Sequence, residues 1–192
     1  MDKILPNETS HNMRVRHMTG LMCGVLLEKY PKYGLSKSIN KAITDSCIMH
    51  DIGKAVVPDS LFDKNDASAS RALVQIKNRP NAGAEMINLM FANSGHQVER
   101  KYAHDICKCM YETYDGKGYP IGLSGDEIPI CAQIVGLVHR YDELRFLPDG
   151  TVKPHKSVMR KILEAEYKVY NPDLLEVLED LSDEFDGIPE MF

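Results

Sequence analysis

The chain has 192 residues, 43% of them hydrophobic and 27% charged, which suits one soluble globular domain with a sizeable core. Its net charge of −5 gives no electrostatic reason to expect duplex nucleic acid as a partner, although a few local cations can still hold a small anion. No apolar stretch is long enough to cross a membrane, and the N-terminus lacks the apolar run of a signal peptide. We therefore expect residues 1–192 to form a single cytoplasmic domain.

The five cysteines agree with a reducing compartment because they follow no disulfide-framework pattern. Cys107 and Cys109 form a CxC pair, but no second Cys/His pair stands at zinc-finger spacing. We interpret them as buried thiols.

A first helix is predicted to begin at Thr9 or Ser10, which are suitable N-caps. Its inward stripe has helical spacing and comprises Val15, Met18, Met22, Val25 and Leu26. His11 precedes Val15 by four residues, so we expect its imidazole to lie on the same stripe.

A second helix is predicted to begin near Ser36, with Ile39, Ile43 and Cys47 facing inward. His50 follows at the next helical step, and Gly53 is a natural stop. Both His11 and His50 should therefore point into one core.

Two further helices, Ala67 to Asn78 and Asn81 to Asn93, are predicted to be divided at Arg79-Pro80. The next inward face comprises Val98, Tyr102, Ile106, Cys109, Met110 and Thr113. Four glycines and two prolines between Asp115 and Pro129 then forbid a regular helix.

Pro129 fits the first turn of a helix that carries Ile134, Val135, Val138 and Tyr141 inward. Two amphipathic helices, around Lys156 to Tyr170 and Pro172 to Phe185, close the chain. No convincing run of alternating strands appears, so we predict an all-α fold of about seven to nine helices.

The pair His50-Asp51 is the most informative dipeptide of the chain. An imidazole and a carboxylate at a helix end can reach one divalent cation, and His11 from another helix would add a third ligand. Lys54, one turn on, suits a phosphate oxygen. The alternative is an ordinary helix-cap pair and a core histidine, but two buried imidazoles and a carboxylate need partners.

The segments NETSHNMRV (7–15) and HDIGK (50–54) resemble the opening of the HD phosphohydrolase superfamily. The run YETYDGKGYPIGLSGDEIP (111–129) resembles the signature of the HD-GYP subgroup, and the resemblance covers about residues 7–165, with the helices of 156–185 packing on that part. It implies an HD-type helical bundle with an irregular GYP loop. It also implies a bacterial metal-dependent phosphodiesterase of cyclic di-GMP signalling, which uses two or three metals.

The resemblance carries over onto part of the site. His11, His50, Asp51 and Lys54 match the first metal ligands and the lysine of the family, and His139 stands where the family has a ligating aspartate. We therefore predict that His11, His50, Asp51 and His139 hold one divalent ion such as iron, manganese or zinc. Lys54 and Asp51 are the predicted catalytic residues.

At the other positions of the family's site, this sequence has different residues. Arg79 replaces one histidine, Met110 and Tyr111 replace a histidine pair, Gln133 replaces an arginine, and Asn7 replaces an acidic ligand beside Glu8. Arginine has no acceptor atom, a thioether is too soft for an oxygen-rich site, and tyrosine binds only as a phenolate. The resemblance therefore implies loss of the second metal.

Arg79 and Lys117 are the predicted substrate-binding residues, since a guanidinium can fork onto a phosphate. The plainer alternatives are that Arg79 points to solvent and Lys117 is an ordinary exposed lysine. The GYP loop either shapes a turn or also docks a diguanylate cyclase domain, as has been proposed for the family.

Three functions follow from these residues. The first is a phosphohydrolase with a one-metal site acting on a phosphate ester or cyclic dinucleotide. The second is an inactive pseudoenzyme that binds a nucleotide or a protein, and the third is a structural metal or none. The expected partners are a cyclic dinucleotide, a cyclase domain and a second copy in a homodimer, with no duplex nucleic acid and no membrane.

Overall fold

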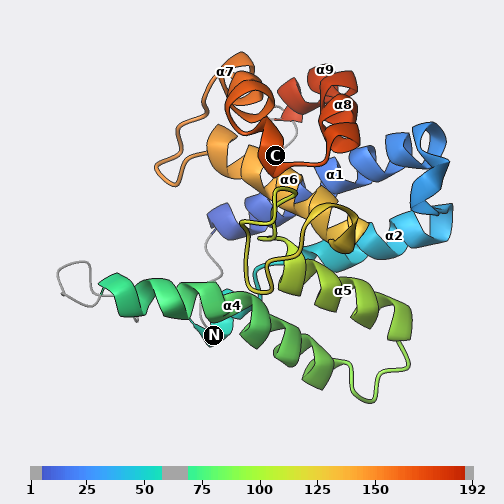
Figure 1. Cartoon of the computed structure of the whole chain (residues 1–192), viewed down its shortest axis with the longest axis vertical. Coiled ribbons are helices and arrows are strands. Elements are labelled where there is room, and N and C mark those ends of the chain that lie inside the picture. The colour runs from blue at the N-terminus through green and yellow to red at the C-terminus, as the bar shows by residue number, and fades with distance from the viewer. Residues whose placement is uncertain (1–5, 58–68, 189–192) are drawn as a thin grey trace.

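The computed structural model describes residues 6–57 and 69–188, and these residues are mostly helical (Figure 1). The helices are α1 (Pro6–Lys29), α2 (Lys37–Ser46), α3 (Gly53–Val56), α4 (Ala69–Met90), α5 (Gln97–Cys109), α6 (Ile130–Arg145), α7 (His155–Arg160), α8 (Pro172–Asp180) and α9 (Ser182–Asp186). Across the two described ranges there is no strand, apart from an isolated bridge between Phe146 and Val152. The predicted all-α class is confirmed.

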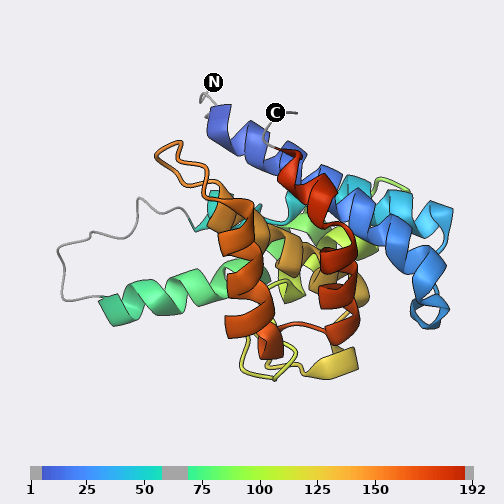
Figure 2. The same cartoon turned by 90° about the horizontal axis from the view of Figure 1, so that it is seen from above.

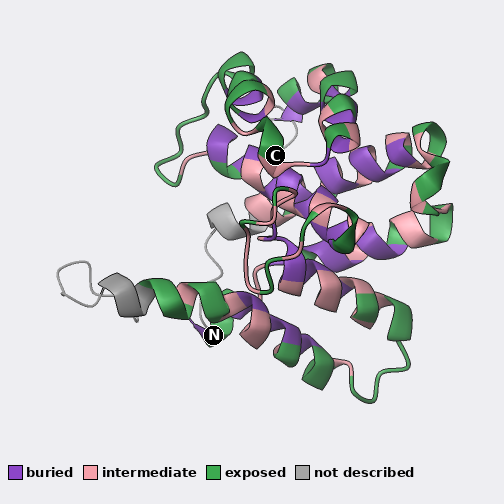
Figure 3. Cartoon of the chain, viewed as in Figure 1, coloured by how far each residue is buried: buried purple, intermediate pink, exposed green. Residues whose placement is uncertain are grey.

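Helix α6 runs through the middle of the bundle, with α1 and α5 on one side and α7 to α9 on the other (Figure 1). It is covered on most sides, and eleven of its sixteen residues are buried (Figure 3). The four residues predicted to face inward are all buried, namely Ile134, Val135, Val138 and Tyr141. This helix fixes the direction in which His139 points.

Helices α1 and α2 follow the predicted pattern closely. The stripe of α1 is buried at Val15, Met18, Met22 and Leu26, while Val25 is half-buried at its edge. Ser36 caps α2, since its hydroxyl accepts a hydrogen bond from the Ile39 amide at 3.2 Å. Helix α1 begins at Pro6, three residues before Thr9 and four before Ser10, the two predicted N-caps.

The predicted division at Arg79-Pro80 is wrong, because α4 is one continuous helix with Pro80 inside it. Proline removes one backbone hydrogen bond there, but α4 packs on α3 and α5 near its middle, and this packing keeps both halves in one helix. The predicted start at Ala67 lies outside the described residues. Figure 2 shows the N-terminal half of α4 projecting away from the bundle.

Four smaller expectations also differ from the structure. Gly53 begins α3 rather than ending α2, which stops at Ser46 and is followed by a 3-10 turn over Cys47–Met49. Val98 is 54% exposed and does not belong to the inward face of α5. The predicted helix 156–170 is α7 continued by a π turn (Lys161–Ala165) and a 3-10 turn (Tyr167–Val169), and the last predicted helix is split into α8 and α9.

Candidate metal centre

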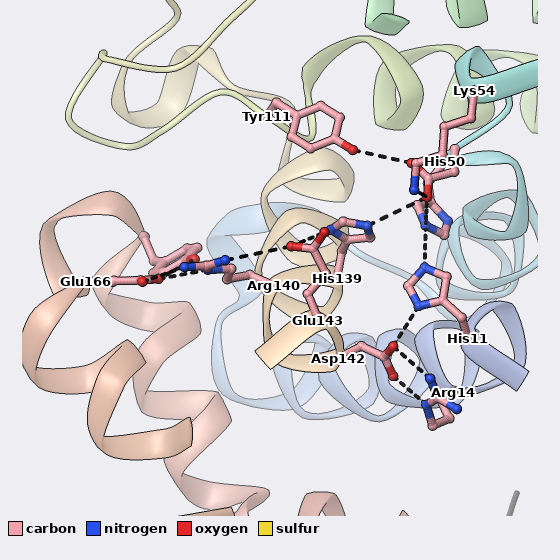
Figure 4. A network of polar contacts seen from close by, with 12 residues as sticks. His11, Arg14, His50, Lys54, Tyr111, His139, Arg140, Asp142, Glu143 and Glu166 are labelled. Carbon is pink, nitrogen blue, oxygen red and sulfur yellow. Dashed lines mark hydrogen bonds and ion pairs between the residues drawn. The ribbon is translucent and has the colours of Figure 1, made fainter. Parts of the chain in front are cut away.

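Four side chains from three distant segments of the sequence meet at one point of the bundle. His11 comes from α1, His50 and Asp51 from the turn before α3, and His139 from α6, and one ligand atom of each lies within 4.8 Å of the others. The two Nε2 atoms of His11 and His50 are 3.1 Å apart, and Nε2 of His139 is 3.8 Å from Oδ2 of Asp51. We call these four residues the His/Asp cluster (Figure 4).

The second nitrogen of each imidazole points away from the centre toward an oxygen, which is at hydrogen-bond distance for His11 and His50. Nδ1 of His11 is 2.6 Å from Asp142, and Nδ1 of His50 is 2.8 Å from the Cys47 carbonyl. Nδ1 of His139 is 3.8 Å from the Glu143 carboxylate. An imidazole that donates from Nδ1 presents its Nε2 lone pair, and this is the arrangement that fixes histidine ligands in metal sites.

Asp142 is a site residue that the sequence reasoning missed. Its carboxylate is buried and accepts two hydrogen bonds from Arg14, at 2.6 and 2.9 Å, besides the one from His11. Burial raises the pKa of Asp142, but the hydrogen bonds from His11 and Arg14 outweigh it and hold the pKa below its usual value. A signal was present, since a charged residue three positions after His139 falls on the apolar side of α6.

The electrostatics of His50 and Asp51 favour a neutral imidazole beside an ionised carboxylate. Burial lowers the pKa of His50 to about 3. Burial also opposes ionisation of Asp51, but the neighbouring His139, His50 and Lys54 lower the pKa of that carboxyl well below its usual range. A neutral imidazole and a carboxylate are the forms in which these side chains bind a metal.

The donor set fits a divalent cation. Asp142 and the Cys47 carbonyl only accept hydrogen bonds, so Nδ1 of both His11 and His50 must donate. Their Nε2 lone pairs then face each other at 3.1 Å, and a proton or a cation must lie between them. The third imidazole and the carboxylate of the cluster make a cation the better fit, because three nitrogens and one oxygen suit zinc, iron or manganese.

Two glycines hold the turn with His50 and Asp51 against α4. A Cβ on Gly53 would lie 2.3 Å from the Arg79 carbonyl oxygen, and one on Gly83 would lie 2.4 Å from Cys107 Sγ and 2.9 Å from Gly53 N. Only glycine permits this approach, and it brings Arg79 next to the cluster.

Arg79 is half-buried and does not simply point to solvent. Its Nε donates to the Val57 carbonyl at 2.8 Å. Together with His50, Asp51, Lys54 and Tyr111 it lines a small cavity of about 10 Å³ beside the cluster. We call this space the Lys54/Arg79 cavity. Lys54 contacts Asp51 there, so both predicted cations lie near the cluster.

Tyr111 borders the same cavity. Its hydroxyl donates to Oδ1 of Asp51 at 3.3 Å, and its ring lies edge-on to His139 with centroids 6.0 Å apart. Burial and the charge of Asp51 raise the pKa of Tyr111 far above its usual value, so the phenol stays protonated and donates to Asp51. Met110 is buried beside it.

The GYP loop is held rigidly next to this side. The buried carboxylate of Glu112 accepts hydrogen bonds from the amides of Ile121, Gly122 and Leu123 at 2.7 to 3.2 Å. The Tyr119 ring stacks on Tyr111, with centroids 5.2 Å apart and planes 6° from parallel. The loop therefore contacts the cluster through Tyr111.

The remaining predicted site residues lie elsewhere. The Lys117 side chain is 82% exposed, pairs with Asp115 at 3.0 Å, and lines neither the cavity nor the cluster. The side chains of Asn7 and Glu8 lie outside what the structure describes.

The fold and the cluster define the class of protein. A family model described as "HD domain" matches residues 7–174, and the chain belongs to this family. Its GYP loop and its relatives make it a member of the HD-GYP group within that family.

The relatives are named as cyclic dinucleotide phosphodiesterases. The chain is 27% identical over 162 residues to the 3'3'-cGAMP-specific phosphodiesterase 2 of Vibrio cholerae, covering 81% of this chain and 29% of that protein. It is 30% identical over 134 residues to the cyclic di-GMP phosphodiesterase response regulator RpfG of Xanthomonas campestris, covering 68% of this chain and 32% of that protein. The chain thus spans about a third of the length of these two relatives.

A solved structure has the same fold. It is that of Bd1817, described as a HDG"Y"P protein, from Bdellovibrio bacteriovorus. The TM-score is 0.63 at 19% identity, and the match covers 90% of this chain and 51% of that one. Among the described residues, no helix has the length and hydropathy needed to span a membrane.

Proposed function

We propose that the chain is a phosphohydrolase that uses one divalent cation and acts on the phosphodiester of a cyclic dinucleotide. The observation that carries this proposal is the His/Asp cluster, whose three imidazoles turn Nε2 toward one centre while the Nδ1 atoms of His11 and His50 are hydrogen-bonded to oxygens behind them. The names of the relatives support the substrate class.

The cation would be held by His11, His50, Asp51 and His139. When bound, it supplies a Lewis acid for a phosphoryl oxygen and lowers the pKa of water. These ligands carry one negative charge, that of Asp51, so a site with a divalent ion is net positive and suits an anionic substrate.

Lys54 and Arg79 would bind the phosphate from the other side. Both line the Lys54/Arg79 cavity next to Asp51, so they bring two positive charges to the side where the family pattern has a second metal. A guanidinium can donate to two phosphate oxygens at once, and an ammonium acts as a compact point charge. Asp51, which is ionised and accepts from Tyr111, would orient the attacking water by a hydrogen bond.

The test combines metal analysis with hydrolysis. Purified protein should contain about one metal ion per chain by elemental analysis and should hydrolyse cyclic di-GMP or bis(p-nitrophenyl) phosphate after loading with manganese, iron or zinc. His50→Ala should lose both properties. His96→Ala is the matched control, since the His96 side chain is 66% exposed at the start of α5. Protein that contains no metal and cleaves neither ester contradicts the proposal.

A second candidate is a pseudoenzyme that binds a nucleotide without turnover. Two observations favour the pseudoenzyme. None of Arg79, Met110 and Tyr111 can replace a histidine ligand, whereas the adjoining GYP loop is intact. Tight binding of cyclic di-GMP in calorimetry, with no hydrolysis by metal-loaded protein, would select this function. Four expectations from the sequence stay predictions: docking of a cyclase domain on the GYP loop, a homodimer, a single domain over residues 1–192, and a cytoplasmic location.

A further inference from the structure

A pocket of about 220 Å³ lies beside the His/Asp cluster. It is enclosed by the end of α5 and the residues that follow, by one face of α6, and by the segment that leads into α8. Its apolar lining includes Ile128, Ala132 and Leu137, and its aromatic lining consists of Tyr111, Tyr114 and Tyr170. Neither the cluster nor the Lys54/Arg79 cavity accounts for this space.

The pocket adjoins the proposed reaction centre directly. His139 lines the pocket and belongs to the cluster. Tyr111 lines both the pocket and the Lys54/Arg79 cavity. His139 and Tyr111 thus place the pocket next to both the cluster and the Lys54/Arg79 cavity.

The chemistry of the lining suits a flat aromatic group with polar edges. Three tyrosine rings offer surfaces for stacking, and stacking on aromatic side chains is tolerant of which base is present. Two charged residues at the pocket supply hydrogen-bonding groups. Arg140 is held by Glu166 at 2.8 Å, and the half-exposed Glu143 lies 3.8 Å from both Arg140 and His139, beyond hydrogen-bond distance. The Glu143 carboxylate therefore keeps capacity to accept from a ligand.

The volume limits what can enter. Pockets for drug-sized ligands measure roughly 300–1,000 Å³, so a space of about 220 Å³ is too small for a whole cyclic dinucleotide. It has room for one base. Gln133 and Asn171 close the inner end with a hydrogen bond to each other at 3.0 Å.

We propose that this pocket is the subsite for one nucleobase of the nucleotide whose phosphate binds at the His/Asp cluster. The inference rests on the proposed function, because it takes the phosphate position from it. Tyr170 is the wall residue best suited to a test, since a second tyrosine of the same segment, Tyr167, is 49% exposed and does not line the pocket.

The experiment measures binding rather than turnover. Manganese-loaded protein is titrated with GMP and with ribose 5-phosphate, which carries the same phosphate but no base. Stacking predicts that GMP binds roughly 5- to 150-fold more tightly than ribose 5-phosphate. Hydrolysis of bis(p-nitrophenyl) phosphate, which has no nucleobase, is measured on the same samples.

Tyr170→Ala should remove most of the preference for GMP and leave the affinity for ribose 5-phosphate unchanged. Tyr170→Phe keeps the ring but loses the hydroxyl contact with Glu166, and it should retain the preference. Tyr167→Ala is the matched control. If thermal unfolding shows that Tyr170→Ala does not fold, Tyr114→Leu, which removes another ring of the lining, takes its place.

The outcomes separate the two proposals. Equal affinity for GMP and ribose 5-phosphate, or a folded Tyr170→Ala protein with an unchanged preference, overturns the base subsite even if esters are cleaved. A preference for GMP that depends on Tyr170 supports the subsite even if no ester is cleaved, and in that case the proposed hydrolysis fails alone.

Discussion

The candidate site has two sides that meet at Asp51. The first side comprises His11, His50 and His139, and the second comprises Arg79, Met110 and Tyr111. Both lie in one helical bundle, but their side chains are fixed in different ways. On the first side the imidazoles of His11 and His50 are each hydrogen-bonded to an oxygen behind them, and the partner of His11, Asp142, is itself fixed by Arg14. On the second side the Arg79 guanidinium and the protonated phenol of Tyr111 line the Lys54/Arg79 cavity, and the Met110 thioether is buried next to Tyr111.

The difference teaches that one side of the candidate site keeps a set of metal-ligand side chains while the other side does not. The oxygen partners of the first side come from α6 and from the turn before α3, and none of them is supplied by the second side. We therefore expect changes at Arg79, Met110 and Tyr111 to leave the hydrogen bonds that orient His11 and His50 intact. Four variants, each with its controls, test this contrast.

The largest effect is expected from His139→Ala. Removing one of three nitrogens should release the metal and lower hydrolysis by roughly a thousandfold or more, because a Lewis acid supplies several kcal/mol. His139→Asp is the informative control, since it restores a competent ligand and should keep the metal. Elemental analysis and steady-state rates measure both, and full metal content in His139→Ala would contradict the assignment of this ligand.

The second side can be rebuilt in the triple variant Arg79→His, Met110→His and Tyr111→His. It restores histidines at the three positions where the family pattern has them, so about one additional metal ion per chain should bind and stabilise the attacking and leaving oxygens. The metal-to-protein ratio and the hydrolysis of cyclic di-GMP measure the gain. No second metal in a folded variant would show that the second side lacks more than ligands.

Asp142→Asn tests the support behind His11. The amide cannot supply the negative charge that orients the imidazole and pairs with Arg14, and loss of such partners lowers metal affinity roughly 10- to 100-fold. Asp45→Asn is the matched control, because Asp45 also pairs with an arginine at 2.6 Å but lies far from the cluster in a partly exposed position. Met110→Leu, on the second side, should leave metal affinity unchanged. Competition with a fluorescent chelator measures all three.

The smallest effect is expected from Lys54→Met. The metal should stay bound, while KM for a phosphodiester should rise about tenfold through loss of a charged hydrogen bond. Lys117→Met tests the other predicted lysine, and its 82% exposed side chain predicts a smaller rise. A larger effect at Lys117 than at Lys54 would mean that the substrate binds over the GYP loop.

The helices and the four clustered residues could be predicted because they depend on patterns of the chain itself. His11 and His50 continue apolar stripes, and His139 lies on the helix that carries the Val135 and Val138 stripe. Periodicity shows which way such side chains point. The resemblance to the HD-GYP signature then indicates that these side chains are metal ligands.

The errors concern contacts between distant segments. Local rules end a helix at Pro80 and at Gly53, but packing against α3 and α5 carries α4 through the proline, and Gly53 is needed for contact with Arg79 and Gly83. The partnership of Asp142 with Arg14 and His11 spans more than 120 residues, so no local pattern reveals it. The pocket lined by Tyr170 is likewise formed by distant segments, because residues that lead into α8 pack beside α6 and the end of α5.

The hydrogen bonds from the GYP loop to Glu112 affect the entropy of ligand binding. Three amides bonded to one buried carboxylate mean that the loop loses its conformational entropy during folding and not during ligand binding. A ligand that enters beside Tyr111 therefore meets a wall that is already ordered, and its affinity is not reduced by a loop-ordering cost. Glu112→Gln should weaken binding mainly through a less favourable entropy, even though Glu112 is not expected to form the main contact with the ligand.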